Sequence, residues 1–216
     1  MDINTTAPES GSQPPAPFSE MDKMMQETSP SGGAGFWAFI REMAKITIIA
    51  LVIILPVRYF LIKPFYVNGA SMIPSYYDGE YLIVDEISYR LGDPQRGDVI
   101  VFRYPADRSQ FFIKRIIGLP GDRVVIGGGL VTVYPHDQEE GIIIDEPYLL
   151  PETPTLSAVD SVLEENNFFV LGDNRNQSLD SRRFGPLERK DIVGRVWLRG
   201  WPLDRLGVLG HYEFGY

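Results

Sequence analysis

Two side chains of this sequence have the chemistry to attack a carbonyl group, a serine at position 71 and a lysine at position 114. Ser71 lies in NGASMIPS, residues 68–75. Pro74 fixes its own φ and favours extended geometry at Ile73, so the hydroxyl is presented on a stiff and uncrowded turn. A serine in a turn is also a common structural residue without any chemical role, and this alternative stays open for Ser71 by itself.

The lysine occurs in FFIKRIIGLPGD, residues 111–122. Alternation along a strand places Phe112, Lys114 and Ile116 on one face. A lysine with apolar neighbours on its own face is expected to be buried, and burial lowers the pKa of an ammonium group by disfavouring its charge. A neutral amine can accept the proton of a serine hydroxyl. The alternative is an edge-strand lysine that discourages sheet pairing.

The amino-acid composition excludes several other kinds of active site. The sequence has no cysteine, which excludes a disulfide framework and a thiolate zinc site. Its two histidines, His136 and His211, lie far from the densest motifs, so we expect neither a histidine triad nor a multi-histidine metal site, and no cofactor. With 29 acidic and 20 basic side chains and a net charge of −9, no nucleic-acid partner is expected. A Ser–Lys dyad is therefore favoured.

A third informative stretch is GDNRNQSLDSRRFG, residues 172–185, which follows the apolar run NFFVL. Such a density of polar side chains suits a loop that satisfies its own buried polar groups and braces neighbouring strands. A plain surface loop is the alternative. The polar residues of this loop include Asp173, Asn174, Arg175, Ser178, Asp180, Ser181, Arg182 and Arg183.

The elements that must position these residues are predicted to be strands. Short β-branched or aromatic runs, separated by Gly, Pro, Asp and Asn, predict a mostly β unit over residues 64–216, an antiparallel barrel or sandwich. Residues 123–170 are expected to form a small β insert within it. The predicted strands are Tyr81–Asp85, Asp98–Phe102, Phe111–Ile117, Arg123–Ile126, Leu130–Tyr134, Gly141–Asp145, Asn167–Leu171 and Asp191–Trp197.

The N-terminal part of the sequence differs from the rest in amino-acid composition. Residues 1–35 are rich in Ser, Thr, Pro, Gly and acidic side chains and are predicted to be disordered. Residues 36–63 are long enough for one transmembrane helix across a hydrocarbon core of ~30 Å, with an uncharged run at Ile46–Pro56. A buried core helix and a cleavable signal peptide are the alternatives. Basic residues flank both ends, so charge leaves the orientation undecided.

Together the three stretches resemble the type I signal peptidases, in the same order from about residue 36 to residue 207. The nucleophile motif of that family corresponds to Ser71-Met72-Ile73-Pro74. The other matching motifs are RGDVIVF at Arg96–Phe102, IKRIIGLPGD at Ile113–Asp122, GDNRNQSLDSR at Gly172–Arg182 and GRVWLRGWPLDRLG at Gly194–Gly207.

The resemblance implies a membrane-anchored serine endopeptidase that removes signal peptides from secretory preproteins after small residues at positions −1 and −3. Ser71 would be the nucleophile, with its backbone N–H in the oxyanion hole, and Lys114 the general base. Membrane lipid would be a further partner. The site-supporting residues would be Ser178, which holds the lysine, with Asp180, Arg182, Arg115, Asp173 and Asn174; Met72, Gly69 and Ala70 would contact substrate.

The resemblance also places residues 1–35 in the cytoplasm and residues 64–216 on the exported side of the cytoplasmic membrane. Gly69 is a departure, because some members carry a serine there whose hydroxyl completes the oxyanion hole. Two rivals are self-cleaving repressor-type Ser–Lys proteases, which lack an anchor, and a membrane-tethered β domain that binds preproteins without cutting them.

Overall fold

The computed structural model describes residues 32–216 except 57–61, 137, 152, 213, 215 and 216. The chain divides into two compact units, Met1–Ile53 and Ile54–Tyr216, which are described separately. Most of the first unit's described residues belong to helix α2, Gly32–Pro56. The second unit consists mainly of antiparallel strands, so the expectation of a mostly β fold is confirmed.

Helix α2 departs from the predicted boundaries at both ends. It begins at Gly32, within the segment predicted to be disordered, although Gly32, Gly33 and Gly35 are poor helix formers. No helix in the described residues combines the length and apolar character required to cross a membrane. The predicted anchor, residues 36–63, includes residues 57–61, which lie outside the described residues.

The end of that predicted helix is a strand instead. Strand β1, Ile62–Tyr66, pairs with β2, Tyr81–Asp85, so Ile62 and Lys63 satisfy their backbone in a sheet. Pro64 is compatible with this assignment because β1 is the edge strand of its sheet and a missing N–H is tolerated there.

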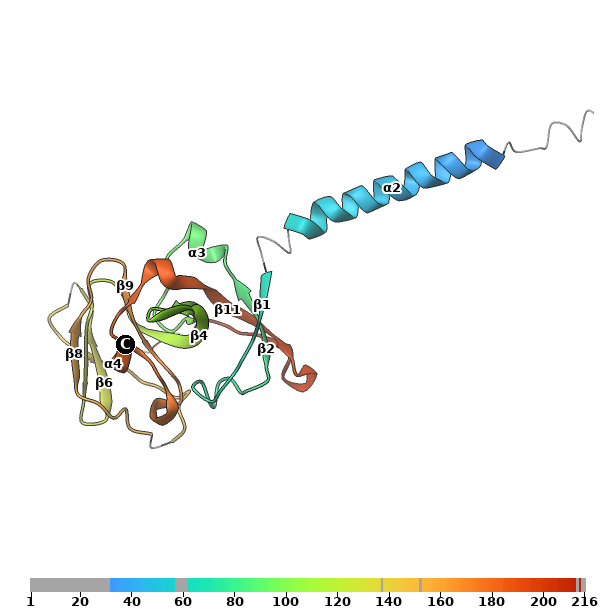
Figure 1. Ribbon diagram of the computed structural model, residues 1–216. Helices are drawn as coiled ribbons and strands as arrows, with labels where there is room; N and C mark the ends of the chain where they lie inside the picture. The colour runs from blue at the N-terminus through green and yellow to red at the C-terminus, as the bar shows by residue number, and fades with distance from the viewer. Residues whose placement is uncertain (1–31, 57–61, 137, 152, 213, 215–216) are drawn as a thin grey trace, which may run out of the picture. The chain divides into compact units, whose positions relative to one another are not determined.

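The main sheet has the strand order β1-β2-β11-β3-β4-β9-β10, with β12 paired to β11. All its pairings are antiparallel (Figure 1). The remaining strands of this sheet are β3 Val99–Tyr104, β4 Asp107–Gly118, β9 Asn167–Leu171, β10 Leu187–Glu188, β11 Ile192–Trp201 and β12 Gly207–Val208.

A second, four-stranded sheet has the order β7-β6-β5-β8. Its strands are β5 Arg123–Gly127, β6 Leu130–Tyr134, β7 Ile142–Ile143 and β8 Val159–Val162, all within the range predicted to be an insert. Short helices connect strands of the main sheet. They are α3 Ser88–Leu91, α4 Ser181–Phe184 and the 3₁₀ helices η2 Arg175–Gln177, η3 Arg189–Asp191 and η4 Leu203–Arg205.

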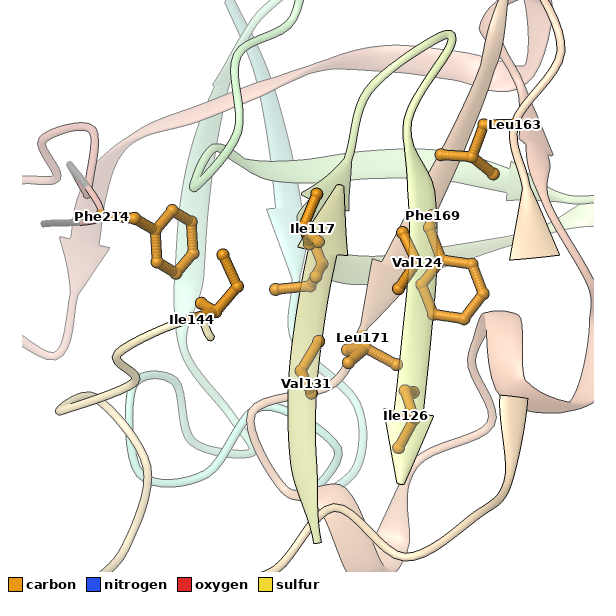
Figure 2. Packing of buried hydrophobic residues seen from close by; sticks show 10 residues of the cluster. Ile117, Val124, Ile126, Val131, Ile144, Leu163, Phe169, Leu171 and Phe214 are labelled. Carbon is orange, nitrogen blue, oxygen red and sulfur yellow. The ribbon is translucent and has the colours of Figure 1, made fainter. Parts of the chain in front are cut away.

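One apolar core joins the two sheets. Ile117 and Leu171 from the main sheet pack in one cluster with Val124 and Val131 from the second sheet (Figure 2). Phe214, near the C-terminus, belongs to the same cluster. Because burial of each such side chain contributes about 1.5–3 kcal/mol, this cluster holds the second sheet against β4 and β9.

Strand β4 has buried residues on both faces. Phe112 packs against a cluster that includes Ile116, and Ile117 packs in the core between the sheets. Lys114 and Arg115 lie between these apolar positions and are 3% and 6% exposed. A lysine that protects a sheet edge is in contact with water, so the edge-lysine interpretation of Lys114 is wrong.

Gly97 provides a test of how tightly the C-terminal segment packs on this sheet. Its φ is +96°, and a Cβ there would lie 2.0 Å from the carbonyl oxygen of Tyr212. We expect Gly97→Ala to lower the free energy of unfolding by about 2–3 kcal/mol, from backbone strain and overlap. The measurement is the urea midpoint. Gly127→Ala, with open space around its Cβ, is the control, and equal midpoints for both variants would contradict the prediction.

Candidate active site

Ser71 lies in a loop between β1 and β2 that is closed by backbone hydrogen bonds. The N–H of Val67 donates to the carbonyl of Glu80 at 2.9 Å, and the N–H of Gly79 donates to the carbonyl of Val67 at 3.0 Å. Gly69 adopts a φ of +99° and donates its N–H to the Asp78 carboxylate at 2.7 Å. The hydroxyl of Ser71 is thus carried by a loop with fixed ends.

Lys114 reaches this loop from β4. Its Nζ lies 2.8 Å from Ser71 Oγ and donates to the carbonyl oxygen of Ile113 at 2.7 Å. Burial lowers the pKa of Lys114 to about 8, although the negative charges of Asp180 and Asp173 act in the opposite direction. About a tenth of the Lys114 side chains are therefore neutral at pH 7, far more than for an ordinary lysine, and the nitrogen lies within hydrogen-bond distance of a serine hydroxyl.

The loop of residues 172–185 clamps the Ser71 turn from the other side. The backbone N–H of Asn174 donates to the Ser71 carbonyl at 3.0 Å, and its side-chain Nδ2 donates to the Ala70 carbonyl at 3.0 Å. Gly172 lies under the same turn, where a Cβ would come 2.6 Å from the Ser71 carbonyl oxygen. The loop therefore needs a glycine at this point to approach the serine so closely.

Arg115 and Asp173 form a buried ion pair next to the lysine. Arg115 Nε and Nη2 lie 3.0 and 2.6 Å from the two carboxylate oxygens of Asp173. The same guanidinium donates to the carbonyl of Gly97 at 3.1 Å and to Ser75 Oγ at 3.4 Å. The pair thereby links β4 to the loop of Asp173 and to the turn that follows Ser71.

A second ion pair closes the polar loop on itself. Arg182 Nε and Nη2 lie 2.8 and 2.7 Å from the carboxylate of Asp180, which also accepts from the N–H of Gly172 at 3.1 Å. Burial alone would raise the pKa of Asp180, but hydrogen bonding and the charge of Arg182 hold it below its usual range. Both residues thus support the loop rather than contacting Ser71.

Ser178 is brought to the site but is not hydrogen-bonded to the lysine in this structure. It is 7% exposed, and its hydroxyl has no hydrogen-bond partner among the described residues. A Cβ at Gly172 would lie 2.1 Å from Ser178 Oγ, which shows how closely the two residues pack. A hydrogen bond between Ser178 and Lys114 is therefore not formed in this structure, and the role of Ser178 in holding the lysine stays a prediction.

A groove of about 310 Å³ runs past the serine and the lysine. Gly69 and Ala70 line it, as expected for residues near a bound peptide. Met72 was expected to line it as well, but it is 1% exposed and packs in the core with Val67 and Tyr76. The lining comprises residues 65–71 and 111–114 with Leu82, Val101, Gln177 and Leu179.

Sequence reasoning missed a charged cluster behind the Ser71 loop. Glu80 is 2% exposed, lies 2.9 Å from Arg199 Nε, and also pairs with Arg205. Arg199 in turn donates to the carbonyl of Ser75 at 2.6 Å. Because Ser75 and Arg199 are 124 positions apart, no pattern of neighbouring residues predicts this contact. The cluster therefore holds the backbone of Ser75, whose hydroxyl accepts from Arg115.

The family model described as signal peptidase, peptidase S26 matches residues 40–201. The chain belongs to the signal peptidase family S26. It is therefore a peptidase, and a hydrolase, as the motifs predicted.

Relatives within the signal peptidase family extend over most of the chain. A probable signal peptidase I-1 of Synechocystis sp. is 37% identical over 185 residues, covering 82% of this chain and 91% of its own length. Signal peptidase I of Leptolyngbya laminosa is 35% identical, with coverages of 89% and 97%. The crystal structure of a signal peptidase I from Enterococcus faecalis V583 matches at 28% identity and a TM-score of 0.41, covering 49% of this chain and 97% of its own.

The buried lysine predicts a pH dependence of stability. Its pKa is about 8 in the folded chain and 10.5 for the ordinary side chain, so between these values the unfolded chain binds more protons and stability rises with pH. Below pH 8 both states are protonated, and the buried ammonium costs stability. The change in the unfolding free energy that this one group contributes amounts to about 2–3 kcal/mol by pH 10.

Lys114→Met isolates this contribution. We expect the variant to be more stable than the native chain at pH 7, with the gap narrowing by about 2–3 kcal/mol at pH 10 as the native lysine becomes neutral. Urea unfolding of both proteins at the two pH values measures the gap. A gap that stays constant would show that the lysine has an ordinary pKa in the folded chain.

Proposed function

We propose that this peptidase removes N-terminal signal peptides from exported preproteins, with Ser71 as nucleophile and Lys114 as general base. The observation that carries the proposal is the 2.8 Å separation between Lys114 Nζ and Ser71 Oγ at a site where burial lowers the pKa of the amine. The relatives named signal peptidase I support signal peptides as the substrate class.

The first chemical step forms an ester between Ser71 and the substrate. Lys114 Nζ accepts the hydroxyl proton as Ser71 Oγ bonds to the carbonyl carbon of the scissile peptide. The resulting ammonium then gives this proton to the leaving amine as the C–N bond breaks. In the second step Lys114 takes a proton from a water molecule whose oxygen bonds to the ester carbon, and gives it to Ser71 Oγ as the ester C–O bond breaks and the carboxylic acid product leaves.

The negative charge on the substrate oxygen needs a donor that is already in place. We assign this role to the backbone N–H of Ser71, because such preorganised donors stabilise the tetrahedral intermediate strongly. The N–H of Gly69 already donates to Asp78 at 2.7 Å, so it is committed to holding the loop. Asn174 supports the arrangement by fixing the Ser71 and Ala70 carbonyls.

Substrate is proposed to bind as an extended strand beside β4. Pairing between β4 and β9 includes Arg115↔Leu171, Ile116↔Val170 and Gly118↔Phe169, and no described strand pairs with residues 107–114 on that side. An added strand would use these backbone groups, with alternate side chains entering the groove. Small residues at −1 and −3 suit a groove narrowed by apolar walls such as Leu82, Val101 and Ile113.

The membrane is the proposed location of the reaction. Residues 36–56 of α2 would form a single-pass anchor in the cytoplasmic membrane, with the strands from β1 onward on the exported side. The uncharged run Ile46–Pro56 supports this placement, as do the large apolar side chains of α2, from Phe36 to Leu55, that are exposed along the helix. A preprotein cleavage site that emerges at a membrane surface would then meet the enzyme there.

Cleavage of a preprotein with an Ala-x-Ala site in detergent tests the dyad. The native chain should cut after the −1 alanine, whereas Ser71→Ala and Lys114→Met should each lose activity on the order of 10³-fold or more. Ser161→Ala and Lys45→Met are control variants outside the groove and should retain activity. Normal cleavage by Lys114→Met would mean that another base activates the serine, and binding without cleavage by the native chain would favour a preprotein-binding domain.

The proposed base also predicts the pH profile. Because the neutral amine is the active form, kcat/KM should rise about tenfold per pH unit below about pH 8 and level off above it. Asp180→Asn removes a charge that raises the pKa of Lys114, so its inflection should move to lower pH. Profiles of kcat/KM between pH 5 and pH 10 measure both. An unchanged or raised inflection in Asp180→Asn would rule out Lys114 as the titrating base.

A further inference from the structure

A second hollow lies outside the groove, at the end of the main sheet where β1 begins and β2 and β3 end. Its volume is about 320 Å³. Five of its ten lining residues are basic and two are acidic, in a chain whose net charge is −9. The five basic residues of this cationic pocket are Lys63, Arg90, Arg103, Arg189 and Lys190.

The acidic residues of the cationic pocket are already paired and covered. Glu86 lies 2.7 Å from Lys63, and its side chain is 11% exposed. Asp191 lies 3.1 Å from Arg108, and its side chain is 3% exposed. The side chains of Arg90 and Lys190, by contrast, are 59% and 58% exposed. The pocket therefore presents positive charge to a ligand and keeps its carboxylates behind it.

Arg103 is the basic residue whose charge is the least compensated. It forms no ion pair with any described carboxylate, and its guanidinium carbon lies 5.3 Å from the ring centre of Phe111. The four other cations of the pocket are in part neutralised, since Glu86 pairs with both Lys63 and Arg90, Asp93 with Arg189 and Glu188 with Lys190. An anion that enters the pocket would thus be attracted most strongly by the guanidinium of Arg103.

The walls of the pocket are held in place before any ligand arrives. Arg189 Nη2 donates to the carbonyls of Tyr89 and Gly92 at 2.8 and 3.1 Å, which ties η3 to α3. The hydroxyl of Tyr89 donates to the buried Asp98 carboxylate at 2.7 Å. A site with fixed walls loses little conformational entropy on binding, which favours affinity.

We propose that the cationic pocket binds the phosphate of an anionic phospholipid headgroup. Guanidinium groups match phosphate oxygens in geometry and charge, and the volume suits one headgroup. Lys63 follows the last residue of α2, Pro56, by only seven positions in the chain, so the pocket is close in sequence to the proposed anchor. This source of phosphate rests on the proposed membrane location.

Binding of short-chain phosphatidylglycerol to the full chain in neutral detergent tests the proposal. Isothermal titration with dihexanoyl phosphatidylglycerol should give saturable binding to the native chain. The double variant Arg90→Ala/Arg103→Ala should bind about 30-fold more weakly, because two cations near the phosphate are lost. Arg123→Ala/Arg183→Ala removes the same charge from exposed positions outside the pocket and should bind like the native chain.

Two further titrations identify the source of the phosphate. Dihexanoyl phosphatidylcholine, with a neutral headgroup, and inorganic phosphate should both bind more weakly than phosphatidylglycerol. If both double variants lost the same affinity for phosphatidylglycerol, the pocket would not be the binding site. If inorganic phosphate bound as tightly as phosphatidylglycerol, the ligand would not be a lipid.

Preprotein cleavage by the native chain is measured separately. Its failure, with the binding differences intact, would count against the proposed function and leave the phosphate site standing.

Discussion

The burial of a single amine, that of Lys114, is the constraint around which this site is built. A buried ammonium is costly, so the folded chain shifts the lysine towards its neutral form and lowers its pKa to about 8. Two carboxylates nearby, Asp173 and Asp180, would undo this shift if they faced the lysine unpaired. Each is instead bound by an arginine, Arg115 or Arg182, and these ion pairs leave the amine in a mainly apolar setting.

Strand β4 serves two purposes because consecutive residues face opposite sides. Lys114 points to the groove and Ser71, whereas Arg115 points inward to Asp173 and to the carbonyl of Gly97. The strand also contributes Ile117 to the core that holds the second sheet. Any shift of register in β4 would therefore exchange the base for the arginine and break the core at the same time.

Local patterns predicted much of this arrangement but not its long-range contacts. Strands with strong alternation, such as Tyr81–Asp85 and Leu130–Tyr134, have the predicted bounds. Strand β1 was missed because its apolar residues continue a helical run and Pro64 is atypical of strands. The Glu80–Arg199 pair depends on tertiary pairing alone, and the burial of Met72 depends on which way its turn faces the core. Neither is encoded in the spacing of neighbouring residues.

The contacts that fix the nucleophile explain why its turn can consist of small residues. Asn174 binds the carbonyls of Ala70 and Ser71, and Arg199 binds the carbonyl of Ser75. These hydrogen bonds hold the backbone and make no use of the side chains of the turn. Gly69 and Ala70 can therefore stay small enough to line the groove, and an extended peptide can approach the serine without loosening the loop that carries it.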